Sequence, residues 1–155
     1  MKKIILLSIF MLGLFTLDMA VKAQAVPATA SWVDQKGVAK TTSTNADTAI
    51  AKIPIPGFNN IVNFEVKITK VSGTAAGKVY LFGNLNGTSP LSEGQFNNKN
   101  PDILDSLTLT DLTVNKKQFK LTSSPAYYYW VIYKPSGTQT STFVCKYIAR
   151  KEFGQ

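Results

Sequence analysis

Residues 62–69 read VNFEVKIT, and this stretch decides the fold class because its polarity changes at every position. Apolar side chains stand at Val62, Phe64, Val66 and Ile68, and the residues between them are polar or charged. A period of two is typical of a β-strand with one buried face and one face in water. The stretch therefore predicts a strand in a sheet that has one face packed on a core and the other face in water.

Similar short patterns recur along the chain and are separated by turn-forming residues. They predict strands at residues 78–83, 107–110, 118–121, 127–134 and 141–150, with weaker patterns at 31–33 and 48–53. No segment after residue 23 shows the apolar period of 3.6 that is typical of a helix. The sequence therefore predicts an all-β protein, an antiparallel β-sandwich of immunoglobulin-like or jelly-roll type with about seven to eight strands.

The first 23 residues have the composition of an export signal. Lys2 and Lys3 precede an uncharged, apolar run at 4–17, and the small residues of 21–23 suit cleavage before Gln24. The run is shorter than the roughly 20 apolar residues of a membrane span. We therefore expect a signal-peptide helix at 1–23, a secreted or cell-surface protein, and membrane contact only through this segment before cleavage.

Removal of 23 residues from 155 leaves 132, which fits one domain. Residues 24–57 are rich in Ala, Thr and Pro, and Pro54 and Pro56 cannot continue a central strand because proline lacks an N–H donor. We therefore expect an N-terminal arm with short strands at 24–57, followed by a sandwich domain at 58–155. Trp32, Ile50 and Ile53 are the candidate assembly residues of this arm, and Trp32 is equally suited to packing on its own domain.

The residues that most enzymes need are scarce. The chain has no histidine, so the commonest general base and zinc ligand are missing. Two carboxylates suffice for glycoside hydrolysis, but no acidic pair lies in a recognisable motif, and Asp102, Asp105 and Asp111 match no calcium-loop spacing. Cys145 is the single cysteine, and its apolar neighbours predict a buried thiol. We therefore expect no enzyme activity, no cofactor and no metal.

The chain is basic, with 17 Lys and Arg residues against 9 Asp and Glu. Without Lys2, Lys3, Lys22 and Asp18, 14 cations and 8 carboxylates remain, a net charge near +6. Thirteen of these 14 cations are lysines scattered along the strands, whereas a nucleic-acid site clusters its cations and favours arginine. We therefore expect solvated strand faces and no nucleic-acid partner.

The densest aromatic run is YYYWVIY at residues 127–133. On a strand, alternate side chains face opposite ways, so one row contains Tyr128, Trp130 and Ile132, and the other contains Tyr127, Tyr129, Val131 and Tyr133. If one row forms the core, the other is free to stack on sugar rings or on a partner subunit, which makes Tyr127, Tyr129 and Tyr133 candidate ligand-binding residues. A strand buried on both sides, or covered by residues 24–57, is an equal alternative. The polar loop at 89–102 is a second candidate binding element.

Five short pieces occur in a characteristic order: VSGT at 71–74, LNGT at 85–88, LTLT at 107–110, YYYW at 127–130 and SGTQT at 136–140. In this order they resemble small β-sandwich modules of phage and phage-like virion structural proteins, and the signal peptide resembles those of exported Bacteroidetes proteins. The resemblance covers about residues 63–151. It implies a repeated, non-catalytic structural or adhesive subunit.

Three functional hypotheses follow. The first is an exported structural or adhesive subunit that acts by self-association or surface attachment, in a virion-like or cell-surface assembly. The alternative is a carbohydrate-binding module of the cell envelope, with a glycan as partner. The third, a carboxylate-based hydrolase, needs two acids facing each other across a cleft, and the sequence does not place them there.

Overall fold

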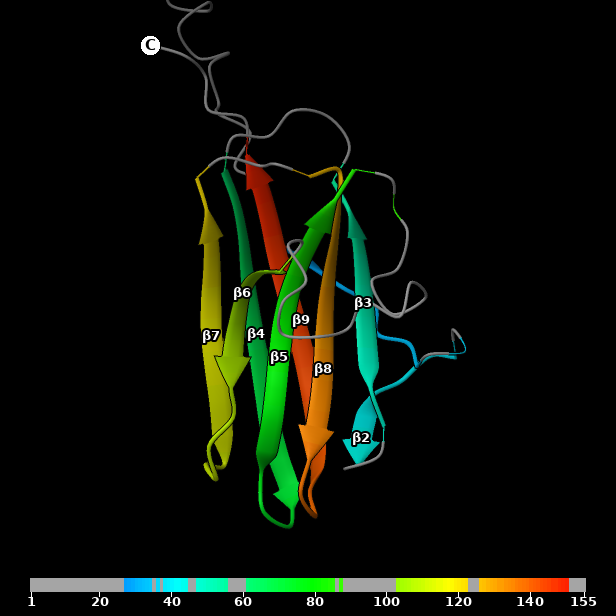
Figure 1. The fold of residues 1–155 in the computed structure, drawn as a ribbon, viewed down its shortest axis with the longest axis vertical. Coiled ribbons are helices and arrows are strands. Elements are labelled where there is room, and N and C mark those ends of the chain that lie inside the picture. Colours follow the sequence, from blue (N-terminus) through cyan, green and yellow to red (C-terminus); the bar gives the residue numbers. More distant parts are fainter. Residues whose placement is uncertain are drawn as a thin grey trace, which may run out of the picture.

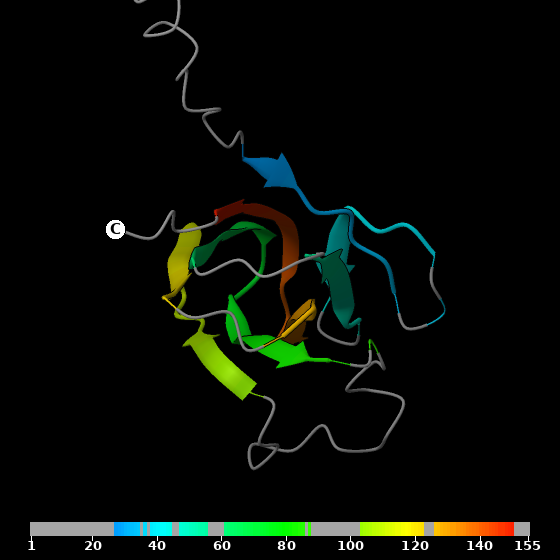
Figure 2. The same cartoon turned by 90° about the horizontal axis from the view of Figure 1, so that it is seen from above.

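The computed structural model describes residues 27–34, 36, 38–44, 47–55, 61–85, 87, 103–122 and 126–150. Within these ranges nine strands and no helix form two antiparallel sheets, which lie along each other (Figure 1) and form two layers when seen from above (Figure 2). The predicted all-β antiparallel sandwich is confirmed. No helix in the described part has the length and hydrophobicity needed to cross a membrane.

One layer, which we call sheet A, is arranged in the order β1-β9-β4-β7, and β2 also pairs with β9. Its strands are β1 (Ala28–Thr29), β2 (Thr42–Thr44), β4 (Ile61–Ser72), β7 (Val114–Leu121) and β9 (Thr140–Arg150). The other layer, sheet B, has the order β3-β8-β5-β6. Its strands are β3 (Ala49–Pro54), β5 (Ala76–Asn84), β6 (Ile103–Thr108) and β8 (Tyr128–Ser136).

The core lies between the sheets because each strand sends alternate apolar side chains inward. In β4 the inward residues Val62, Phe64 and Val66 are fully buried, as the alternation in this stretch predicts. Sheet B contributes inward residues from β3, β5 and β8, namely Ala49, Ala51, Ile53, Val79, Leu81, Tyr129, Val131 and Tyr133. Each sheet thus keeps an outer face directed away from this core.

Successive strands mostly change sheet, as at β3–β4, β4–β5, β6–β7, β7–β8 and β8–β9. The turn between β4 and β5 contains Gly73 with φ +74°, a conformation that side chains disfavour. A Cβ atom there would overlap the carbonyl oxygen of Thr138, in the turn between β8 and β9. The two turns therefore lie against each other at one end of the sandwich.

The segment 24–57, predicted as an arm with short strands, contains three strands in its described residues. Its described residues supply β1 and β2, which pair with β9, and β3, which pairs with β8 through six residues. Pro54 is tolerated because β3 lies at an edge of sheet B and ends there. The described residues of this segment therefore contribute strands to both sheets, and the domain boundary at residue 57 stays a prediction. The predicted signal peptide at 1–23 and the polar loop at 89–102 lie outside the described residues.

Candidate functional site

Two of the three candidate tyrosines are core residues. Tyr129 and Tyr133 are 0% exposed, and their rings pack 5.1 Å from Phe64 and 5.9 Å from Phe143. Rings enclosed between two sheets present no face to a ligand, so Tyr129 and Tyr133 do not stand on an open surface in this structure. Tyr127, just before β8, is 37% exposed. Burial also raises the pKa of the Tyr133 hydroxyl, against the opposing effect of a hydrogen bond with Ser141.

In the opposite row of β8, Trp130 and Ile132 are also buried, and Tyr128 is half-buried. Trp130 and Ile132 lie on the outer face of sheet B and form a second apolar cluster with Ile50, Tyr80 and Phe82. Val33, from the segment before β2, packs against this cluster. The alternative of a strand buried on both sides therefore describes β8, and neither of its rows forms an open aromatic platform.

The candidate assembly residues are used within their own chain. Trp32 packs on Phe143 with ring centroids 4.8 Å apart, Ile53 is a core residue, and Ile50 belongs to the outer cluster of sheet B. All three are more than nine-tenths buried. These side chains are therefore packed within their own chain, and their role in assembly stays a prediction.

Most of the described acidic residues form ion pairs with lysines. Lys70 lies 2.7 Å from Asp111, Lys117 lies 2.6 Å from Asp105, and Lys40 lies 3.0 Å from Asp47. The hydrogen bond from Lys70 and another from the Ala75 amide lower the pKa of Asp111. Within the described ranges no three Asp, Glu or Cys side chains come together in a way that would hold a metal ion. Asp102 lies outside those ranges.

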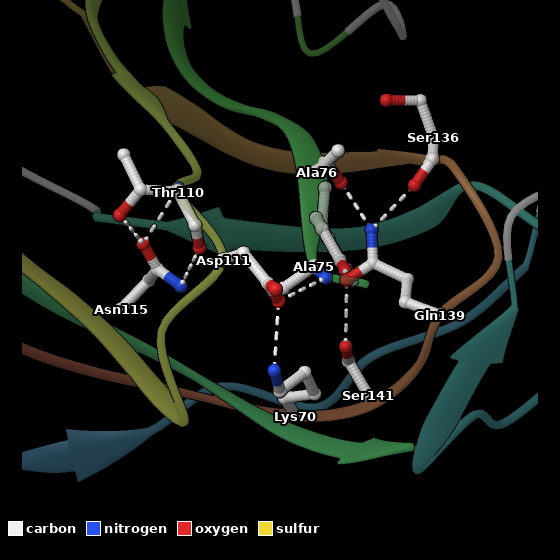
Figure 3. Close-up of polar contacts among 10 residues, drawn as sticks. Lys70, Ala75, Ala76, Thr110, Asp111, Asn115, Ser136, Gln139 and Ser141 are labelled. Atoms are coloured by element: carbon white, nitrogen blue, oxygen red, sulfur yellow. Dashed lines mark hydrogen bonds and ion pairs between the residues drawn. The ribbon is translucent and has the colours of Figure 1, made fainter. Parts of the chain in front are cut away.

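A polar centre at the turn end of the sandwich was missed by sequence reasoning (Figure 3). Gln139 is 2% exposed, and its Nε2 donates to the carbonyl oxygens of Ala76 and Ser136. Its Oε1 accepts from the hydroxyls of Tyr133 (3.1 Å) and Ser141 (2.9 Å). Every hydrogen-bonding position of the Gln139 amide is thus filled by the protein, which indicates a structural role and leaves no position for a ligand.

A set of exposed polar and charged side chains lies on the outer face of sheet A. There β4 pairs with β7 on one side and with β9 on the other, and the three strands run side by side in Figure 1. A groove of ≈ 390 Å³ lies over these strands and the start of β1. Its lining includes Asn63, Glu65, Gln118, Lys146, Ile148 and Arg150.

The strand register places these groove residues in cross-strand rows. Glu65 stands between Gln118 of β7 and Lys146 of β9, and Asn63 stands between Lys120 and Ile148. Lys116 approaches Glu65 to 2.8 Å. This contact is the main cause that lowers the pKa of the Glu65 carboxyl, so Glu65 is ionised at neutral pH. The groove therefore combines a carboxylate, two amides and two cations on rigid strands.

The alternation in residues 62–69 already places Asn63 and Glu65 on the wet face of β4. The missing information was the identity of the neighbouring strands. Gln118 and Lys146 are far from Glu65 in the chain, and only the sheet pairing brings them beside it. No local pattern encodes that pairing, so the groove was not predicted from the sequence.

Comparisons with family models and with curated proteins gave no match. Among solved structures, the CBM22-1 xylan-binding domain of Xyn10C from Paenibacillus barcinonensis has 10% identity and a TM-score of 0.44, covering 83% of this chain and 97% of that one. The C-terminal CBM6 of LamC, a laminarinase of Zobellia galactanivorans, has 7% identity and a TM-score of 0.41, covering 78% and 98%. Tailspike protein 4 of bacteriophage CBA120 has 12% identity and a TM-score of 0.43, covering 81% of this chain and 18% of that one. At these values the similarities carry no conclusion about function.

Proposed function

We propose that this chain is a non-catalytic binding module that holds a glycan on the outer face of sheet A. The observation that carries the proposal is the groove of ≈ 390 Å³, whose polar side chains come from neighbouring strands of one sheet. Its volume falls in the range of about 300–1,000 Å³ that is common for ligand sites. Because the lining residues project from paired strands, the site is formed before a ligand arrives, which lowers the entropy lost on binding.

The mixture of groups suits a ligand that is rich in hydroxyls. A hydroxyl both donates and accepts hydrogen bonds, and the amides of Asn63 and Gln118 do the same. Glu65 accepts, and Lys146 and Arg150 donate. The apolar side chain of Ile148, beside Asn63, offers a contact for the carbon-bound hydrogens of a sugar ring.

The predicted export signal supports this function, because extracellular and envelope polysaccharides are encountered outside the cytoplasm. We propose that the protein works as a secreted or cell-surface module. Attachment to a glycan is also an adhesive function, so this proposal retains the adhesive part of the first hypothesis.

A glycan array tests the proposal with the purified protein and two double variants. Replacement of Asn63 and Gln118 by alanine removes the two amides of the groove, and we expect it to weaken every detected interaction. The matched control replaces Thr74 and Thr138 by alanine, because these exposed residues lie in the turns at one end of the sandwich, outside the groove lining. Equal loss in both variants, or no binding to any glycan, would contradict the proposal.

Self-association is the second candidate function, and exposed apolar residues favour it. Val114 and Val144 lie on the outer face of sheet A and are 40% and 42% exposed, and Val71 and Leu112 are also exposed. Pairing through the edge of β7 is disfavoured, because Lys116, Lys117 and Lys120 stand on that edge strand. Light scattering tests this candidate, since Val114→Lys with Val144→Lys should dissociate any oligomer that these side chains hold.

A further inference from the structure

We infer that the ligand of the sheet A groove is an anionic polysaccharide, one that carries carboxylate or sulfate groups along its chain. The inference rests on the proposed glycan-binding function and specifies its substrate class. It is based on the charges on the outer face of sheet A and on the elongated shape of the charged area. It is also based on a comparison with lysines elsewhere, which form ion pairs with aspartates.

The outer face of sheet A concentrates positive charge. Among the described residues, its outward side chains include five cations and one carboxylate, Glu65. The cations are Lys67, Lys116, Lys120, Lys146 and Arg150. Five positive charges against one negative charge leave a net charge of +4 on this single face.

Within the described residues, four of the five cations of this face form no ion pair, whereas three lysines elsewhere do. Lys40, Lys70 and Lys117, which lie elsewhere, each form an ion pair with an aspartate. On the outer face of sheet A, Lys116 pairs with Glu65. Within the described residues no ion pair forms to the other four cations, Lys67, Lys120, Lys146 and Arg150. Their charges are available to a ligand.

One cross-strand pair on this face is repulsive. Lys67 of β4 stands directly opposite Lys116 of β7 in the register. Like charges at such positions destabilise a sheet, and a single carboxylate nearby offsets only part of the effect. An anionic ligand lying across the two strands would relieve this repulsion, so its binding is linked to greater stability of the folded protein.

The charged area is elongated. From Ile61, opposite Arg150, to Lys67, opposite Lys116, β4 advances by six residues, or about 20 Å. The three strands span about 10 Å across. An area of this shape suits an extended chain ligand better than a single small anion.

The groove favours a polysaccharide over a nucleic acid. Sites for single-stranded nucleic acid stack bases on exposed aromatic rings, and the outward side chains of β4, β7 and β9 include no aromatic residue in the described ranges. Phe64 and Tyr147 also line the groove, but Phe64 is a core residue and Tyr147 packs against the core. Glu65 in the middle of the groove would repel a phosphate chain but can accept hydrogen bonds from hydroxyls. Arginine, which pairs with phosphates through two hydrogen bonds, occurs on this face only as Arg150.

The test compares pairs of polymers that share a backbone and differ in charge. Affinities of the purified protein are measured for polygalacturonate and its methyl ester, and for dextran sulfate and dextran, at about 50 mM and about 500 mM NaCl. We expect at least about tenfold tighter binding to the charged member of one pair, and loss of that preference at high salt. Duplex DNA is the competing polyanion.

Two double variants locate the effect. Lys120→Gln with Lys146→Gln should weaken the affinity for the charged polymer by about tenfold. The control, Lys36→Gln with Lys78→Gln, removes the same amount of charge outside this face. Its affinity for the charged polymer should stay within about twofold of that of the unchanged protein. Glu65→Gln keeps an oxygen acceptor but removes the carboxylate, so it should tighten anion binding. Circular dichroism checks that each variant is folded.

The outcomes separate the two proposals. Equal affinity for the charged and neutral members of a pair overturns the anionic class and leaves the glycan-binding function standing. No binding to any polysaccharide overturns both. DNA binding as tight as that of the charged polysaccharide, or equal losses in the two double variants, overturns the inference, because the surface would then attract any polyanion.

Discussion

Gln139 shows how one buried amide fixes the end of the sandwich. Its four hydrogen bonds reach β5, β8 and β9, so they join both sheets at the turns (Figure 3). Buried polar groups are costly when unpaired, and here all the partners depend on one side chain. Sequence reasoning could not assign this role, because the GTQT turn looks polar and exposed until its side chain is placed.

Gln139→Leu should lower the free energy of unfolding by about 3 kcal/mol, since it leaves two hydroxyls and two carbonyl groups without this partner. The control is Gln118→Leu on the exposed side of β7, which should change stability by less than about 0.5 kcal/mol. Urea denaturation measures both. Equal effects of the two substitutions would show that the Gln139 hydrogen bonds are not important for stability.

Asp111 links protonation to folding. Its pKa is lowered, chiefly by the Lys70 hydrogen bond, so the folded state favours the ionised carboxylate. The resulting stabilisation is fully present above the ordinary pKa of 3.8 and is lost as the pH falls through the lower folded-state pKa. Urea midpoints should therefore decrease as the pH falls from 3.8 through the lower folded-state pKa, and Asp111→Asn should show a weaker dependence there. An unchanged pH profile in the variant would contradict this role.

Cys145 should behave as an inert core residue. It is fully buried in β9, and burial raises the pKa of its thiol to about 12. The nucleophilic thiolate is therefore scarce at neutral pH, and reagents cannot reach the sulfur. Ellman's reagent should modify Cys145 only after unfolding in denaturant. Rapid modification of the native protein would show that this part of β9 opens.

At the scale of elements, the strands that could be predicted are those with one wet face. β4 and β9 show a clear alternation because their inner residues enter the core and their outer residues meet water. β8 carries apolar residues in both rows and is buried on both faces, so its pattern does not reveal which row faces the core. Tyr129 and Tyr133 were therefore assigned to a surface that they do not reach.

The β3 strand decides whether residues 24–57 belong to the sandwich. Ile53 enters the core from β3, and Ile53→Ala should cost about 2–4 kcal/mol of stability through lost apolar contacts and the resulting cavity. Val38→Ala, in the same segment but 61% exposed, should cost less than about 0.5 kcal/mol. Chemical denaturation compares the two. A negligible effect of Ile53→Ala would restore the interpretation of this segment as a separate arm.

At the scale of the whole molecule, the two outer faces differ in character. The outer side of sheet B carries a buried apolar cluster. The outer side of sheet A has a groove whose cations, Lys146 and Arg150, form no ion pair within the described residues. The sequence reveals that the chain is basic and that its lysines lie on wet strand faces. Only the pairing of β7, β4 and β9 shows that five cations share one surface.

The most direct test of binding at the outer face of sheet A is a two-dimensional ¹H–¹⁵N NMR titration with an oligogalacturonate. We expect the largest shift changes at the backbone amides around Asn63, Glu65, Gln118, Lys146 and Arg150, and small changes in β3 and β5 of sheet B. Saturable changes centred on sheet B, or no changes with this ligand and with a sulfated oligosaccharide, would contradict the account.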